Sequence, residues 1–149
     1  MAILTSRFTD ETLAINKRYR ENQNIACVYG SLLRLSDNIP YENLFVLEMN
    51  NSQNKLAGIG VISKKFYPRE KIYSDTSYNM YTYKGNYHIL PEELPPEMLL
   101  EIEKLLFYGK SHLKRGGSVM RFPDKWTKPE YIKTLTNILN DKKALKPQT

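Results

Sequence analysis

The residues best suited to chemistry in this chain lie in one short segment, residues 109–118, which reads Gly-Lys-Ser-His-Leu-Lys-Arg-Gly-Gly-Ser. It carries four positive or titratable side chains, those of Lys110, His112, Lys114 and Arg115, beside three glycines. Such a cluster can hold a phosphodiester by charge and through exposed backbone amides. The alternative is a solvated basic turn that joins two helices. The segment is therefore a candidate contact for nucleic acid.

A nucleotide-binding P-loop is excluded at the same place. Gly109-Lys110-Ser111 matches the end of that motif, which also needs a glycine five residues before the glycine of the Gly-Lys pair. That position is Lys104, inside an expected helix. The backbone there cannot wrap a phosphate.

The net charge of +6 is distributed unevenly along the chain. The last 46 residues, from Lys104 to Thr149, hold eleven basic and three acidic residues, a net charge of +8, which leaves −2 on the residues before them. An asymmetry of this size favours a polyanionic partner, RNA or DNA or another anionic surface. The alternative is a basic end that only keeps the chain dispersed in water.

Tyrosine is the second unusual feature, because six of the 11 tyrosines fall between Tyr67 and Tyr87. In strand geometry Tyr81 and Tyr83 point the same way, beside Lys84, and such aromatic rings can stack on unpaired bases. Tyrosines also pack at the rims of small cores, and Trp126 has the same two interpretations. The predicted nucleic-acid-binding residues are Tyr81, Tyr83, Lys84, Lys110, His112, Lys114, Arg115 and Arg121.

The case for catalysis is weak. The only histidines, His88 and His112, lie far apart on different expected elements, and Cys27 has the apolar neighbours of a buried, inert thiol. Glu48 is the one acid in an apolar strand, and a lysine–carboxylate pair with Lys110 is the arrangement to look for at a functional site. We predict no catalytic residue, no metal site and no cofactor.

The pattern of apolar residues predicts an α+β fold: a small, curled, mostly antiparallel sheet or open barrel flanked by helices. We expect one domain over residues 1–149, with a barrel-like core at 25–125 and a basic loop at 109–118. Gly58 and Gly60 would allow close packing in that core. Helices are expected at 9–22, 97–108 and 128–140, strands at 25–29, 44–49 and 56–62, a second hairpin from 78–83 and 87–90, and a flexible tail at 141–149.

Length and composition exclude several other classes of protein. No apolar run approaches the roughly 18 residues that span a bilayer, and the start of the chain is too soon charged for a signal peptide. A single cysteine excludes an internal disulfide and a cysteine-rich metal site. We therefore expect an intracellular protein that does not associate with membranes.

The paired segments Leu44-Phe45-Val46-Leu47-Glu48 and Leu56-Ala57-Gly58-Ile59-Gly60-Val61-Ile62, with Tyr81–Ile89 opposite them, resemble the PUA-like superfamily in its EVE and ASCH branches. The stretch Leu106–Gly116 also resembles uncharacterised proteins of large DNA viruses of algae and amoebae. The resemblance implies an open, curved barrel that binds RNA or a modified base in its cleft. The viral likeness implies a location in the cytoplasm or nucleus of a host cell, or in the virion.

Two alternatives to a binding module remain open at this stage. One is a structural or virion-associated protein whose basic C-terminal third contacts the genome or an acidic capsid partner. The other is a hydrolase, which the ASCH resemblance allows, with Lys110, His112 or Glu48 as its acid–base group.

Overall fold

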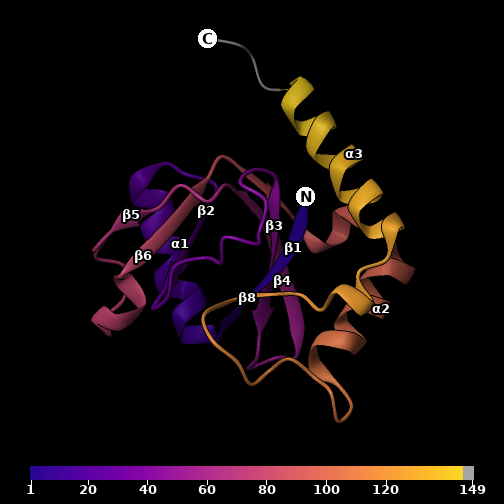
Figure 1. The fold of residues 1–149 in the computed structure, drawn as a ribbon, viewed down its shortest axis with the longest axis horizontal. Coiled ribbons are helices and arrows are strands. Elements are labelled where there is room, and N and C mark those ends of the chain that lie inside the picture. Colours follow the sequence, from indigo (N-terminus) through magenta and orange to yellow (C-terminus); the bar gives the residue numbers. More distant parts are fainter. Residues whose placement is uncertain (146–149) are drawn as a thin grey trace.

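A five-stranded sheet forms the middle layer of the structure, a computed structural model that describes residues 1–145 (Figure 1). The strands lie in the order β7-β4-β3-β1-β8, with β1 parallel to β3 and every other pair antiparallel. Their bounds are β1 Ala2–Phe8, β3 Leu44–Asn50, β4 Lys55–Ile62, β7 Tyr87–Ile89 and β8 Val119–Arg121.

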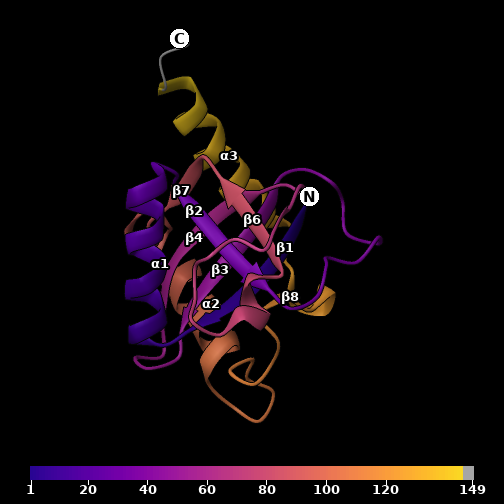
Figure 2. The same cartoon turned by 90° about the vertical axis from the view of Figure 1, so that its left-hand side faces the viewer.

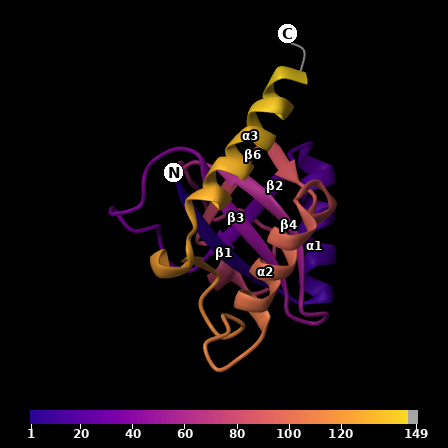
Figure 3. The same ribbon diagram turned by 90° about the vertical axis from the view of Figure 1, so that its right-hand side faces the viewer.

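Two further layers cover the faces of this sheet. Helices α2 (Pro96–Phe107) and α3 (Pro129–Leu145) cross one face, as Figure 3 shows. A three-stranded sheet in the order β2-β6-β5 and helix α1 (Asp10–Gln23) lie on the other side (Figure 2). The strands of the smaller sheet are β2 Cys27–Ser31, β5 Tyr67–Pro68 and β6 Tyr81–Gly85.

Because both faces of the central sheet are covered, its inner strands are apolar on both sides. On β3, Phe45, Leu47 and Met49 pack against the helices, whereas Leu44 and Val46 join the core between the two sheets. The fold class is α+β with open, curled sheets, as predicted.

The predictions of a helix at 9–22 and of a hairpin from 44–49 and 56–62 are confirmed. Thr9 caps α1, accepting a hydrogen bond from the Thr12 amide while the Thr12 hydroxyl accepts one from the Thr9 amide. Strands β3 and β4 pair as an antiparallel hairpin around the polar residues 51–54. Helix α2 is also found within one residue of its expected bounds.

The second predicted hairpin is wrong. β6 pairs with β2 and β5, whereas β7 pairs with β4 in the other sheet. Gly85 lies so close to β4 that a Cβ atom there would be 1.9 Å from the carbonyl oxygen of Val61. At this point the chain passes from one sheet to the other instead of reversing.

Two boundaries of the predicted core also need correction. The core expected at 25–125 leaves out β1, which lies inside the large sheet between the central strand β3 and the edge strand β8. Residues 141–145 of the expected flexible tail are the last turn of α3, and residues 146–149 lie outside the described range. No helix among residues 1–145 has the length and apolar character that crossing a membrane requires.

Candidate nucleic-acid interface

The basic loop, residues 109–118, joins α2 to β8 and is fastened to the body of the protein by hydrogen bonds. Arg7, on β1, donates from Nε to the Leu113 carbonyl at 2.6 Å and from Nη1 to the Gly117 carbonyl at 3.0 Å. Asn51 donates from Nδ2 to the Lys114 carbonyl at 3.1 Å, and the Leu113 amide donates to the carbonyl of Leu106 at 2.8 Å. Arg7, Asn51 and the end of α2 therefore all hold the loop by hydrogen bonds, whereas a solvated turn would need no such bonds.

Arg7 is the residue that the sequence prediction missed. It lies partly buried beneath the loop, and burial lowers the pKa of its guanidinium group from the usual value. A guanidinium fork can reach two carbonyls at once, which an ammonium group cannot do as well. The only sequence signal for this role is one arginine in the otherwise uncharged run Ala2–Phe8.

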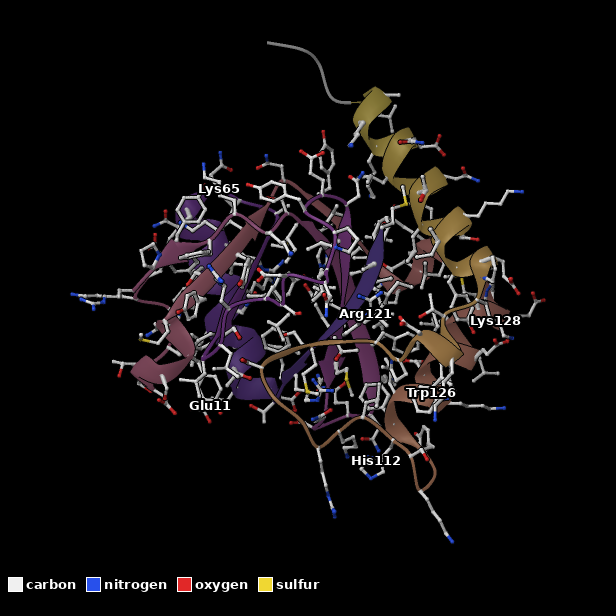
Figure 4. All side chains as sticks on the ribbon, in the orientation of Figure 1. Glu11, Lys65, His112, Arg121, Trp126 and Lys128 are labelled. Carbon is white, nitrogen blue, oxygen red and sulfur yellow. The ribbon has the colours of Figure 1, made fainter. Side chains whose placement is uncertain are left out.

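The anchored loop leaves its own cations exposed to solvent. Lys110 and Arg115 are exposed and Lys114 is half-buried, and within residues 1–145 no carboxylate pairs with any of the three. His112 accepts at Nδ1 from the amide of Lys114 at 3.2 Å, which helps to fix the loop. In Figure 4 His112 marks this loop, on the opposite side of the molecule from Lys65.

The other predicted site residues do not share this surface. Tyr83 has no exposed surface, so its prediction as a stacking residue is wrong: its hydroxyl accepts from the Leu35 amide inside the core. Tyr81 is half-buried, and its ring packs edge-on against that of Phe66 at 5.1 Å. Strand alternation put both rings on one face, as predicted, but that face is covered.

Lys84 and Arg121 are engaged in ion pairs. Lys84 Nζ lies 3.3 Å from a Glu70 oxygen and 4.5 Å from the centre of the Tyr67 ring. Burial alone would lower the pKa of Lys84, but hydrogen bonds with Tyr19 and Glu70 outweigh it and raise the pKa. Arg121 Nε lies 3.0 Å from Asp124. Lys84 and Arg121 are therefore paired with carboxylates, unlike the cations of the basic loop.

A cleft of about 370 Å³, the Arg7 cleft, opens beneath the glycines at the end of the loop. Its walls bring the basic loop together with Tyr73 and Tyr78, not with the predicted pair Tyr81 and Tyr83. Two carboxylates, Glu11 and Asp75, also line it, so its charge is mixed. None of Lys110, Lys114 and Arg115 lines this cleft, so they define a separate positive surface, the outer side of the loop.

A second polar cluster is buried between the two sheets. Tyr29 donates to Glu48 Oε2 at 2.5 Å, and His88 Nε2 lies 2.9 Å from Glu48 Oε1. Gly58 and Gly60 leave the space for it, since Cβ atoms there would lie 2.4 Å from the His88 ring and 1.9 Å from the Tyr29 hydroxyl oxygen. The partners of Glu48 are thus Tyr29 and His88, whereas Lys110 is exposed on the basic loop.

Two side chains at this buried cluster, Tyr29 and Cys27, have raised pKa values. Burial, with the charge of Glu48, raises the pKa of Tyr29 well above its usual value, and burial raises that of the neighbouring Cys27 thiol to about 12. A protonated, buried thiol is a poor nucleophile. Neither Tyr29, Glu48 nor His88 lines the Arg7 cleft. Among residues 1–145, no three His, Cys, Asp or Glu residues are placed to hold a metal ion.

Comparisons with known proteins add no relative: no protein-family model, curated protein or solved structure matches the chain. The resemblance to the PUA-like superfamily thus stays a prediction.

Proposed function

We propose that this protein binds single-stranded nucleic acid, RNA or DNA, through the outer side of the basic loop. The observation that carries the proposal is the set of three cations, Lys110, Lys114 and Arg115, which no carboxylate among residues 1–145 neutralises. A protein that neutralises phosphates with such side chains releases the counterions condensed on the nucleic acid, which favours binding.

The anchoring of the loop supports the same function. Ordering a loop upon binding costs free energy, and a loop that is already held avoids much of that cost. Arg7 and Asn51 hold the backbone of the loop through carbonyl groups, so the charged ends of its lysines remain available.

Single strands are proposed because exposed aromatic rings flank the loop on both sides. Tyr108, just before the loop, is 57% exposed, and Tyr78, across the Arg7 cleft, is 44% exposed. Rings placed beside cations can stack on unpaired bases, which a duplex keeps within its own stack.

The test is the affinity of a fluorescently labelled single strand, measured by anisotropy at low salt. Replacing Lys110, Lys114 and Arg115 together by Ala should weaken binding by roughly tens-fold or more, because three phosphate contacts are lost. The matched control replaces Lys17, Arg18 and Lys65 together by Ala. These three residues are also exposed, and the change removes the same charge from other parts of the protein. It should retain most of the wild-type affinity.

Equal losses in the two triple variants would contradict the proposal, because they would show that only net charge matters. Unchanged affinity in the loop variant would contradict it as well. Thermal unfolding of both variants should match that of the wild type, since exposed charges contribute little to stability.

A further inference from the structure

We propose that a second hollow, the Trp126 groove, binds one unpaired nucleobase together with its phosphate. The groove has a volume of about 420 Å³ and lies between the end of α2, the start of the basic loop and the turn Asp124–Trp126. This inference rests on the proposed function and deepens it, because it places a base-stacking site next to the phosphate-binding loop. Its lining residues include Glu101, Lys104, Tyr108, Lys110 and Trp126.

The aromatic part of the groove is held in a fixed position. The indole ring of Trp126 is half-buried and packs edge-on against the buried ring of Phe122, with 6.0 Å between the ring centres. The Trp126 amide donates to the Pro123 carbonyl at 3.0 Å. In Figure 4 Trp126 lies beside α2, between His112 on the loop and Lys128, which directly precedes α3. The ring thus lines the groove while its edge-on packing on Phe122 supports it from the core.

Tyr108 supplies a second aromatic ring to the same groove. It is 57% exposed, although its amide is fastened to the Lys104 carbonyl at the end of α2. An aromatic side chain with this much exposed surface stabilises the fold little. Stacking on such rings changes the affinity for a single strand by roughly tenfold to a hundredfold per base.

The charge of the groove suits an anion. Lys104 and Lys110 are exposed, and within residues 1–145 neither forms an ion pair. The one acid in the lining, Glu101, is neutralised by an ion pair with Lys128 and a hydrogen bond from the Tyr131 hydroxyl. Lys125 does not line the groove, but its ammonium group lies 5.6 Å from the centre of the Trp126 ring.

The end of α2 is arranged so that it repels an anion less. The last carbonyls of a helix carry partial negative charge. Here the amides of Tyr108 and Leu113 satisfy the carbonyls of Lys104 and Leu106. Gly109 has a φ of +82°, a conformation that glycine adopts without strain, and it turns the chain just before Lys110, which also lines the groove. The turn therefore brings a cation to a helix end that would otherwise be negative.

The test uses the fact that Trp126 is the only tryptophan in the chain. Its fluorescence in the full-length protein should be quenched when a short oligothymidylate is added, because a stacked base quenches indole emission. An abasic strand of the same length carries the same phosphates and should bind more weakly with little quenching. Tyr108→Ala should weaken binding of the oligothymidylate roughly tenfold and leave the affinity for the abasic strand unchanged.

The outcomes separate this inference from the proposed function. Binding of oligothymidylate without quenching, and with full affinity in Tyr108→Ala, would overturn the groove and leave the loop as the binding surface. Failure of the wild-type protein to bind either strand would overturn both. Polyglutamate that binds as tightly as oligothymidylate and shares the dependence on Tyr108 would assign the groove to an acidic protein partner instead.

Discussion

At the scale of single residues, Glu48 is the most unusual side chain in the protein, because it is a buried carboxylate in the core between the sheets. It is 4% exposed, and it links Tyr29 of the smaller sheet to His88 of the larger one. The unfavourable desolvation of such a group is offset only while both partners remain in place.

We therefore predict that Glu48→Ala lowers the free energy of unfolding by about 2–4 kcal/mol, because the buried Tyr29 hydroxyl and His88 would both lose their acceptor. Glu48→Gln keeps an oxygen that can accept from Tyr29, so its loss should be smaller. Urea unfolding of the two variants measures the difference. If Ala and wild type unfold at the same urea concentration, the network does not hold the sheets together.

The thiol of Cys27 gives a pH dependence with a definite sign. Burial raises its pKa in the folded state to about 12, above the value of about 8.5 for an unfolded thiol. Its contribution to stability is therefore fully present below about pH 8.5 and is lost as the pH rises toward 12.

Cys27→Ala removes this contribution, so its free energy of unfolding should fall less between about pH 8 and about pH 11 than that of the wild type, by about 3 kcal/mol. The titrating groups that do not interact with Cys27 cancel in the comparison, whereas Tyr29, whose pKa the Cys27 charge also raises, does not cancel fully. Parallel pH profiles for the two proteins would show that the thiol is not shielded as described.

At the scale of elements, the glycines of β4 are required by what packs against them. A Cβ atom at Gly60 would lie 1.9 Å from the Tyr29 hydroxyl oxygen and 2.8 Å from Cys27 Sγ, both in the tightly packed core. We predict that Gly60→Ala costs about 1–3 kcal/mol through overpacking. Gly117→Ala is the control, because a Cβ atom there meets only Met120, at an ordinary 3.7 Å. Differential scanning calorimetry should show a lower melting temperature for the first variant alone; equal values would contradict the packing argument.

The basic loop depends on one residue of another element. Arg7→Lys keeps the charge but cannot reach the carbonyls of both Leu113 and Gly117 with a planar fork. Amide hydrogen exchange at residues 109–118 should become roughly fivefold faster, because about one kcal/mol of loop stabilisation is lost. Exchange in α1 serves as the internal reference. Unchanged exchange in the loop would mean that Arg7 does not hold it.

The helices and the first hairpin could be predicted because the residues that mark them are neighbours in the sequence. The polar turn at 51–54 sits between two apolar runs, and Thr9 marks the start of α1. The second hairpin failed because the Gly85-Asn86 turn signal does not reveal that Gly85 must pack on Val61 of another sheet. Strand β1 was missed because Thr5, Ser6 and Arg7 interrupt its apolar run.

The candidate site was predictable to a similar degree. The excess of lysine and arginine pointed to the basic loop, because most lysine and arginine side chains remain exposed. Alternation along β6 correctly put Tyr81 and Tyr83 on one face, but only the three-dimensional structure shows that the core covers Tyr83. The roles of Arg7 and Tyr108 depend on contacts between distant segments, which a single sequence does not contain.

At the scale of the whole molecule, the layers separate the parts that stabilise the fold from the surface proposed to bind. The buried residues lie between the central sheet and its two covering layers, whereas the basic loop emerges at one end beyond α2 and β8 (Figure 1). Charge on this loop can therefore change with little effect on the core. The molecule should tolerate substitutions there that alter binding alone.

The most direct test of this account is the dependence of binding affinity on salt. For single strands, the slope of log affinity against log salt is about −0.7 for each phosphate contact. Replacing Lys110, Lys114 and Arg115 by Ala should make the slope less steep by about 2, whereas Tyr108→Ala should weaken binding and leave the slope unchanged, because stacking releases no counterions. An unchanged slope in the triple variant would contradict the claim that the basic loop binds phosphates.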